Sequence, residues 1–430
     1  MSHLLGVLHQ AGSTTLDGAS YGYDSAGNRT SKTNYINGIT SNYGYDPIYE
    51  LLQVTQDGST TESYSYDAVG NRLSSSGVPT YSYNSSNELT ATSSGSYTYD
   101  ANGNTLSDPS TKSYSWDFEN RLTQAVVPGT NGGTTTFKYD PFGRRIQKSG
   151  PLGTTNYLYD GQDISSNVIE ELDSVGNVLA RYAQGPGIDR PLAEFNSGAA
   201  SYYEADALGS VTSLSNSAGA AVNTYSYDSF GNLITFAGVI TNHLQYTGRE
   251  FDPETGLNFY RARYYSNSAG RFVSEDPIGF EGGNDFYAYV RNNPVLWIDP
   301  LGLVSCTYDV TGHHFHCTSD DGSQSFDTTH VRSGNSSCMN NPECNSTRNE
   351  GPIPPGRYSM GGMGDTPNPH RIPRVYLTPM KGTFTFGRDS FEVHQGGDNS
   401  SAGCITLDPG AYTIFRQFYS IDNHGVTTVQ

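Results

Sequence analysis

The sequence has few aliphatic residues and little positive charge. Only 34% of its 430 residues are hydrophobic, and 24 Lys and Arg stand against 43 Asp and Glu, which gives a net charge of −19. Because so acidic a chain repels phosphate backbones, we expect no nucleic acid among its partners. No apolar run approaches the length of a membrane span, and the first residues lack the basic start of a Sec signal peptide. We therefore expect no membrane span and no export by a Sec signal.

Cysteine is absent from the first 305 residues. The chain has five cysteines: Cys306, Cys317, Cys338, Cys344 and Cys404. Four of them suffice for two disulfides, which would leave Cys404 as the odd thiol and indicate an oxidising compartment. A two-residue turn at 311–312 would place Cys306 opposite Cys317, while Cys338 and Cys344 would close a small loop. The alternatives are reduced structural cysteines, or a zinc site in the histidine-rich stretch 313–317, whose spacing does not favour a metal.

Tyrosine and glycine are abundant, with 32 and 49 residues, and they occur in a repeat. The unit reads aromatic-x-Tyr-Asp-x-x-Gly-Asn, as in YGYDSAGNRT at Tyr21, YSYDAVGNRL at Tyr64 and YTYDANGNTL at Tyr97. Alternation places both aromatic residues on one face of a strand, and D-x-x-G-N supplies a turn in which one residue takes a positive φ. Each unit therefore predicts strand, turn and strand, and neighbouring units must join into one sheet to be stable.

These units resemble the YD repeats of RHS proteins over roughly residues 20–303. The resemblance implies a spiralling β-sheet shell that encloses a C-terminal toxin. We therefore expect a mainly β protein, with an RHS-type shell followed by a small β-rich domain. The expected domains are the repeat shell over 1–245, a core segment over 246–303 and a toxin domain over 304–430.

The segment from YTGREFDPETGL to WIDPLGL resembles the RHS core segment, which in that family cleaves the chain just after DPxGL. The resemblance implies self-cleavage between Leu303 and Val304, with Asp276 and Asp299 as the catalytic pair and Arg271 in support. Two neighbouring carboxylates resist joint ionisation, so that one can act as acid and the other as base. The alternative is that both Asp-Pro-x-Gly stretches are turns that only shape the chain.

The stretch FEVHQGGDNSSAGCITL carries one histidine and one cysteine at the two ends of a loop. If the apolar residues of both flanking strands face the core, His394 and Cys404 point to the opposite face. We expect the two strands to pair as a hairpin, which would bring these residues together. A neighbouring imidazole lowers the pKa of a thiol and serves as its base, so the pair predicts a cysteine nucleophile.

This stretch resembles the active-site motif of L,D-transpeptidases, most closely the short-loop form found in type VI secretion effectors. The resemblance implies that Cys404 is the nucleophile and His394 the base, with Ser401 and Gly403 shaping the turn. Arg388 is a weak candidate for binding the substrate carboxylate. The implied substrates are peptidoglycan stem peptides, acted on by L,D-carboxypeptidase or exchange chemistry without a cofactor or metal.

The resemblances also imply partners and a destination. We expect an immunity protein, a secretion apparatus or N-terminal RHS partner, and action in the periplasm of a target bacterium after delivery. Two alternatives remain open: another cysteine peptidase toxin, and a non-enzymatic YD-repeat protein that binds at a cell surface.

Overall fold

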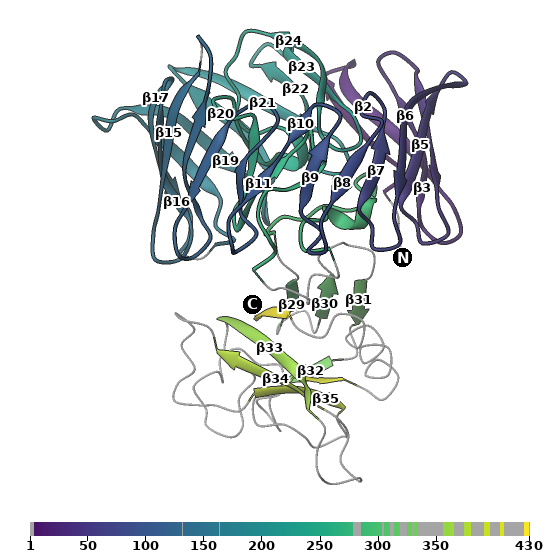
Figure 1. The fold of residues 1–430 in the computed structure, drawn as a ribbon. Helices are drawn as coiled ribbons and strands as arrows, with labels where there is room; N and C mark the ends of the chain where they lie inside the picture. The colour runs from purple at the N-terminus through teal and green to yellow at the C-terminus, as the bar shows by residue number, and fades with distance from the viewer. Residues whose placement is uncertain are drawn as a thin grey trace. The chain divides into compact units, whose positions relative to one another are not determined.

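The chain folds into two compact units, which a computed structural model describes to different depths (Figure 1). The first unit comprises Met1–Pro277 and Asp285–Gly302, and the second comprises Ile278–Asn284 and Leu303–Gln430. The structure describes residues 4–130, 132–162, 164–277 and 285–302, and after residue 302 only the backbone of the strands β29 to β37.

The wall of the first unit consists of consecutive antiparallel strands, each paired with the next along the chain. Within the described residues, the first sheet contains β1 (Gly6–Ala11), β2 (Thr14–Tyr23), β3 (Arg29–Asn34), β4 (Thr40–Tyr45), β5 (Leu51–Gln56), β6 (Ser59–Tyr66) and β7 (Arg72–Ser75). A short sheet follows with β8 (Tyr81–Tyr83), β9 (Leu89–Thr92) and β10 (Gly95–Ser96). The largest sheet contains β11 (Thr98–Tyr99), β12 (Thr105–Ser107), β13 (Ser113–Trp116), β14 (Leu122–Val127), β15 (Gly133–Tyr139), β16 (Arg145–Gly150), β17 (Gly153–Tyr159), β18 (Val168–Leu172), β19 (Val178–Gln184), β20 (Pro191–Asn196), β21 (Ala199–Ala205), β22 (Val211–Asn216), β23 (Ala221–Tyr227) and β24 (Leu233–Gly238).

An aspartate closes the turn of each complete repeat. Asp67 Oδ1 accepts hydrogen bonds from the backbone N–H of Val69 (3.0 Å) and Asn71 (2.9 Å), and Asp67 Oδ2 accepts one from the Asn71 side chain (3.0 Å). Gly70 completes the turn with φ +91°, a value that favours glycine. The same bonds recur around Asp24, Asp100, Asp173 and Asp228. The repeat is therefore a turn closed by its own side chains, as the pattern predicts.

The tyrosine before that aspartate ties each unit to the preceding one. Tyr66 Oη donates to the Leu51 carbonyl (3.0 Å), and Tyr159 Oη donates to the Arg145 carbonyl (2.8 Å). Tyr45, Tyr83, Tyr99, Tyr139 and Tyr227 make the equivalent bond, and Trp116 makes it through its indole N–H. We call this series the hydroxyl ladder. The first aromatic residue of the unit is buried instead, as at Tyr21, Tyr81 and Phe137.

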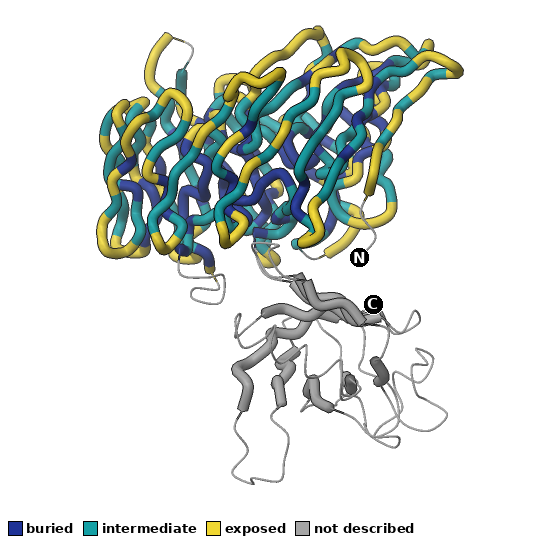
Figure 2. Tube along the Cα trace, turned by 90° about the vertical axis from the view of Figure 1, so that its right-hand side faces the viewer, coloured by how far each residue is buried: buried dark blue, intermediate teal, exposed yellow. Residues whose placement is uncertain are grey.

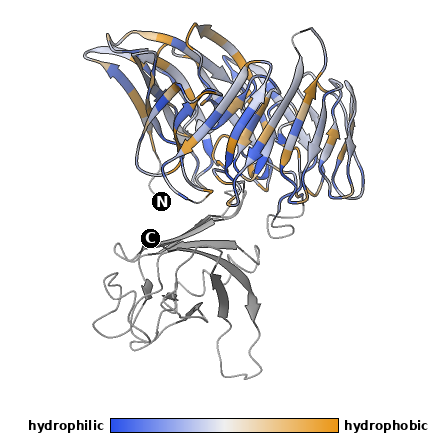
Figure 3. Ribbon diagram, turned by 90° about the vertical axis from the view of Figure 1, so that its left-hand side faces the viewer, coloured by the Kyte–Doolittle hydropathy of each residue, from blue (hydrophilic) through white to orange (hydrophobic). Residues whose placement is uncertain are grey.

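Strands from opposite ends of the wall lie against each other. His9 Nε2 lies 2.8 Å from the Ala205 carbonyl, and Lys32 forms an ion pair with Asp206 at 2.9 Å. Many buried residues lie within the strands, and exposed residues are frequent at the turns, although β24 is exposed along its whole length (Figure 2). Hydrophobic and hydrophilic residues also alternate along the strands, as expected for a sheet with one covered face (Figure 3).

The core segment, residues 246–302, is buried and contacts the wall at many points. It contains η1 (Tyr246–Gly248), β25 (Glu250–Asp252), β26 (Leu257–Tyr260), β27 (Arg263–Ser266), β28 (Arg271–Phe272) and η3 (Val290–Asn292). Tyr265 Oη donates to the Phe230 carbonyl (2.9 Å), and Tyr287 Oη donates to the Gly103 carbonyl (2.7 Å). Its aromatic residues pack with one another, for example Tyr265 on Tyr289 with ring centroids 4.5 Å apart. This packing fixes the segment that carries Asp276 and Asp299.

The second unit has one sheet among its described strands, in the order β31-β30-β29-β37-β33-β34-β35-β36-β32. Its strands are β29 (Ser305–Asp309), β30 (His314–Thr318), β31 (Ser325–Thr328), β32 (Val331–Ser333), β33 (Gly356–Gly364), β34 (Arg374–Pro379), β35 (Phe391–Gln395), β36 (Ile405–Leu407) and β37 (Gly425–Val429). In the described part of the chain, no helix has the length and apolar character needed to cross a membrane.

Candidate active site

One buried arginine joins the two aspartates that the sequence singles out. Arg263 Nη2 lies 2.8 Å from Asp276 Oδ2 and 3.3 Å from Asp299 Oδ2. All three residues are buried, with exposed fractions of 3%, 6% and 3%. The Arg263 guanidinium also stacks 3.7 Å from the ring centroid of Phe272, and its Nη1 donates to the Phe286 carbonyl (3.1 Å). The residues Asp276 and Asp299, which are 23 positions apart in sequence, therefore meet at a single cation.

Local turns hold the two aspartates in place. The backbone N–H of Asp276 donates to the Phe286 carbonyl (2.9 Å). Asp299 Oδ1 accepts the backbone N–H of Gly302 (2.5 Å), and Gly302 has φ +67°, so Asp299 closes a tight turn over 299–302. The backbone N–H of Ala262 donates to the Leu301 carbonyl (3.4 Å). The chain is therefore fixed up to the residue before Leu303.

This arrangement is suited to acid–base chemistry. Where two carboxyl groups occupy one buried site, one of them can hold a proton while the other is ionised. One carboxyl group can then give a proton while the other takes one, as general acid and base. The predicted pairing of Asp276 with Asp299 thus has a geometric basis. Leu303 and Val304, the residues of the predicted scissile bond, lie outside the described residues.

The arginine that contacts both aspartates is Arg263, and the predicted supporting role of Arg271 stays a prediction. Arg271 Nη2 pairs with Asp285 Oδ1 (3.0 Å) and donates to the Asn87 carbonyl (2.9 Å). Burial raises the pKa of Asp285, against the opposing effect of Arg271. The sequence signal for Arg263 is the stretch LNFYRARYY, where charged residues interrupt an otherwise apolar, buried run. A charge in such a run needs a buried partner.

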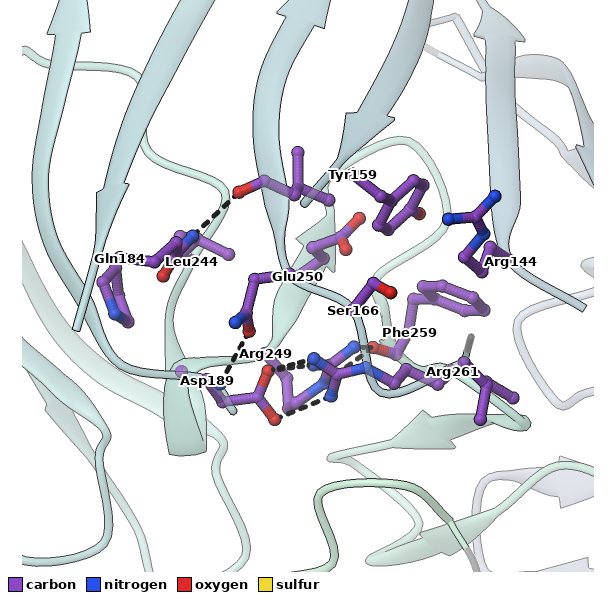
Figure 4. Close-up of a pocket in the computed structure, with 15 residues that line it drawn as sticks. Arg144, Tyr159, Ser166, Gln184, Asp189, Leu244, Arg249, Glu250, Phe259 and Arg261 are labelled. Atoms are coloured by element: carbon purple, nitrogen blue, oxygen red, sulfur yellow. Dashed lines mark hydrogen bonds and ion pairs between the residues drawn. The ribbon is translucent and has the colours of Figure 1, made fainter. Parts of the chain in front are cut away.

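A second cluster of charged residues lies beside the same segment. Asp189, from the loop between β19 and β20, accepts two hydrogen bonds from Arg261 (2.7 and 2.8 Å) and one from Arg249. Both guanidinium groups point at the Asp189 carboxylate, and the residues line a cavity of ≈ 20 Å³ (Figure 4). A cavity of this size holds about one water molecule.

In the second unit the predicted hairpin around His394 is wrong. The strands β35 and β36 pair in parallel, and the residue in register with His394 is Thr406. Alternation along each strand is the same for parallel and antiparallel pairs, so the sequence pattern did not separate them. The other residues predicted for this site lie outside the described residues: Arg388, Ser401, Gly403 and Cys404.

The register predicted for the first hairpin of this unit is confirmed. The strands β29 and β30 are antiparallel, with Cys306 opposite Cys317. A disulfide between them stays a prediction. Cys338 and Cys344 lie outside the described residues.

Comparison with known proteins identifies the family. A family model described as Teneurin YD-shell matches residues 10–295, more than half of the chain. The chain belongs to the Teneurin YD-shell family. A second family model, described as Tlde1 domain, matches residues 327–429. The predicted limits at 245/246 and 303/304 stay predictions.

The relatives of this YD-shell chain include named nucleic-acid enzymes. It is 36% identical over 291 residues to the tRNA3(Ser)-specific nuclease WapA of Bacillus spizizenii, a match that covers 66% of this chain and 11% of the relative. It is 27% identical over 319 residues to the double-stranded DNA deaminase toxin A of Burkholderia cenocepacia, covering 66% and 22%. The chain thus spans only about a tenth to a fifth of these relatives.

Solved structures confirm the fold. A crystal structure of TcdB2-TccC3-TEV matches with a TM-score of 0.56 and 22% identity, covering 70% of this chain and 18% of that chain. At this identity the likeness shows the fold alone. Together with the family match and the antiparallel sheets, it confirms the predicted mainly β, RHS-type shell.

The names of the relatives contradict the predicted function. They refer to tRNA and DNA, whereas the sequence predicts a cysteine L,D-transpeptidase or carboxypeptidase that acts on peptidoglycan stem peptides, with no nucleic acid among the partners. The predictions of a peptidoglycan substrate, of a cysteine enzyme and of no nucleic-acid partner are therefore wrong. The net charge of −19 belongs to the whole chain, while a binding site is local, so it does not decide what one domain binds.

Proposed function

We propose that this YD-shell chain is the toxin-carrying part of an RHS toxin, and that it cleaves itself after Leu303. The observation that carries the proposal is the contact of one buried nitrogen, Arg263 Nη2, with both Asp276 and Asp299. The Asp299–Gly302 turn supports it, because it fixes the chain immediately before the bond to be cut.

The proposed reaction is hydrolysis of one peptide bond. One carboxylate of the Asp276–Asp299 pair takes a proton from water as the water oxygen bonds to the Leu303 carbonyl carbon. The other, protonated, carboxyl group gives its proton to the Val304 nitrogen as the carbon–nitrogen bond breaks. The products are a carboxylate at Leu303 and an amine at Val304. Arg263 keeps the two carboxyl groups together and balances the charge that remains on them.

Replacement of either aspartate tests the proposal. Wild-type chain should separate into two pieces on a denaturing gel, and the smaller piece should begin at Val304 by terminal sequencing. Asp276→Asn and Asp299→Asn should each slow cleavage by at least about 100-fold, since each removes an acid or a base. The matched control is Asp285→Asn, which removes a buried aspartate bound to Arg271 instead. A wild-type chain that folds and stays in one piece would overturn the proposal.

We propose that the part after Leu303 is the toxin, delivered into a target cell. The names of the relatives, which include a deaminase toxin, support this assignment. Induced expression of the full chain, followed by analysis of tRNA and genomic DNA, tests whether the chain shares their named substrates. Growth arrest is the expected result, and unimpaired growth with a cleaved chain contradicts the toxin assignment.

A further inference from the structure

A loop of the wall reaches the segment that precedes the proposed cleavage site. This loop, residues 185–190, connects β19 and β20, and it carries Asp189 some 70 residues before Arg261. The Asp189 carboxylate accepts two hydrogen bonds from the Arg261 guanidinium, at 2.7 and 2.8 Å, in the bidentate geometry that fixes an arginine most firmly. The loop is itself anchored, since the Asp189 N–H donates to Asn167 Oδ1 (3.0 Å).

Arg261 in turn holds the cleavage segment. Its Nη1 donates to the Pro300 carbonyl (2.6 Å). The next residue, Ala262, donates its backbone N–H to the Leu301 carbonyl, and Arg263 contacts Asp299. Each of the three consecutive residues 261–263 therefore contacts one of the three consecutive residues 299–301.

Burial and charge make Asp189 important to the contact of Arg261 with Pro300. The side chains of Asp189, Arg249 and Arg261 are exposed by only 9%, 3% and 7%. The guanidinium groups of Arg249 and Arg261 repel each other, and the Asp189 carboxylate accepts hydrogen bonds from both (Figure 4). Without its negative charge, Arg261 would lose both the anchor and the balance of charge that keep it beside Pro300.

We propose that Asp189 is a positioning residue for self-cleavage, acting through Arg261 on the Pro300 carbonyl. This inference rests on the proposed self-cleavage. It adds a condition to that reaction: the chain is cut only after the β19–β20 loop has folded onto the core segment. Cleavage then reports that this side of the shell is complete.

The test is the rate of cleavage during cell-free synthesis of the full chain, followed on denaturing gels after a pulse of labelled methionine. Asp189→Asn should slow cleavage about 10- to 100-fold, because a displacement of about 1 Å at the reacting groups can cost about 100-fold in rate. Arg261→Met should slow it by a similar factor. Because both changes break the same link, Asp189→Asn with Arg261→Met should be no slower than the slower single variant.

Matched controls separate positioning from folding. Glu170→Gln removes a carboxylate that pairs with Arg181 on the neighbouring β18–β19 hairpin, and it should leave the rate unchanged. Tryptophan fluorescence should show the native fold in each variant. If Asp189→Asn does not fold, Arg261→Lys serves instead: it keeps a positive charge beside Asp189 but cannot bind both Asp189 and Pro300 in the same way, and slow cleavage is expected.

The outcomes distinguish this inference from the proposed function. If wild type cleaves, Asp276→Asn does not, and a folded Asp189→Asn cleaves at the wild-type rate, the positioning role is overturned while self-cleavage stands. Multiplying losses in the double variant would also overturn it, because the two residues would then act independently. If the folded wild-type chain is never cut, the proposed function fails, and the positioning role fails with it.

Discussion

Two buried arginines of the shell each contact two carboxylates, but they do so differently. Arg145 is fully buried at the start of β16. Its Nη2 pairs with Glu250 (2.6 Å), and its Nη1 pairs with Asp252 (2.5 Å). Lys148 adds a second cation to Asp252 at 3.0 Å. Burial alone would raise the pKa of Asp252, but the attraction of Arg145 and Lys148 outweighs it and holds that pKa below its usual value. The cluster joins the wall to the core segment through ion pairs.

At Arg263 one nitrogen serves both Asp276 and Asp299. The two carboxylates at Arg145 contact different nitrogens, and Asp252 also contacts Lys148. The difference indicates how a single fold uses the same residue types for two purposes. The Arg145 cluster links the wall to the core segment, while the contact of two carboxyl groups with one nitrogen suits the proposed acid–base chemistry.

The largest expected effect is on stability. Arg145→Met leaves Glu250 and Asp252 buried without their arginine, and removal of one partner of a buried ion pair costs about 3–5 kcal/mol. We expect the free energy of unfolding to fall by that amount in urea, followed by the fluorescence of Trp116 and Trp297 in uncleaved Asp276→Asn chain. Arg181→Met, whose side chain is 64% exposed, is the control and should change stability by less than about 1 kcal/mol. Equal losses in both variants would show that the Arg145 cluster is not a cross-link.

The next effect is on cleavage. Arg263→Met should slow self-cleavage about 100-fold, the usual loss when one preorganised charge is removed from an active site. Arg271→Met is the matched control: it removes a buried arginine that pairs with Asp285 and should cleave at close to the wild-type rate when folded. Cleavage on denaturing gels measures both. Should Arg271→Met be as slow as Arg263→Met, the distinction between the two arginines fails.

The smallest effect is on pH dependence, at the buried carboxylate of Glu50. Glu50 Oε1 accepts Asn292 Nδ2 (2.9 Å), and burial raises the pKa of Glu50 from 4.5 to about 7. A raised pKa means that the folded state binds the proton more tightly than the unfolded state, so this contribution to stability is present below pH 4.5 and is lost as the pH rises through 7.

Glu50→Gln should remove this pH dependence. Both proteins are unfolded in urea at pH 5 and at pH 8. The free energy of unfolding of the variant minus that of the parent should be larger at pH 8 than at pH 5. Glu119→Gln, at a half-exposed side chain, serves as the control and should show no such change. An unchanged difference between pH 5 and pH 8 for Glu50→Gln would contradict the assignment.

Local features of the fold were predictable from the sequence, and distant ones were not. The strand–turn–strand unit follows from Y-x-Y-D-x-x-G-N because the Asp67 bonds close within five residues. The hydroxyl ladder was not predicted, because the pattern does not show that the hydroxyl group of the second tyrosine donates to a carbonyl of the preceding unit. The partners of Arg145 lie more than 100 residues away, a distance that no periodicity encodes.

The candidate site was predictable only in part, because its contacts also join residues that are distant in the sequence. Resemblance to the RHS core segment predicted Asp276 and Asp299. It pointed to Arg271, which pairs with Asp285, rather than to Arg263, which contacts both aspartates. The parallel pairing of β35 with β36 likewise depends on the whole sheet of the second unit rather than on the residues between His394 and Cys404.

The hydroxyl ladder bears on how such a shell changes in length. Each aspartate turn is complete in itself, and each tyrosine needs only the strand before it, so a duplicated unit would bring every partner that it requires. The core segment limits this freedom, because it contacts several separate units of the wall: Asn292 binds Glu50, Arg271 binds the Asn87 carbonyl, and Arg145 of β16 binds Glu250 and Asp252. A unit gained or lost between two such contacts would move one of them out of reach. Length variation among related shells should therefore be confined to units that the core segment does not contact.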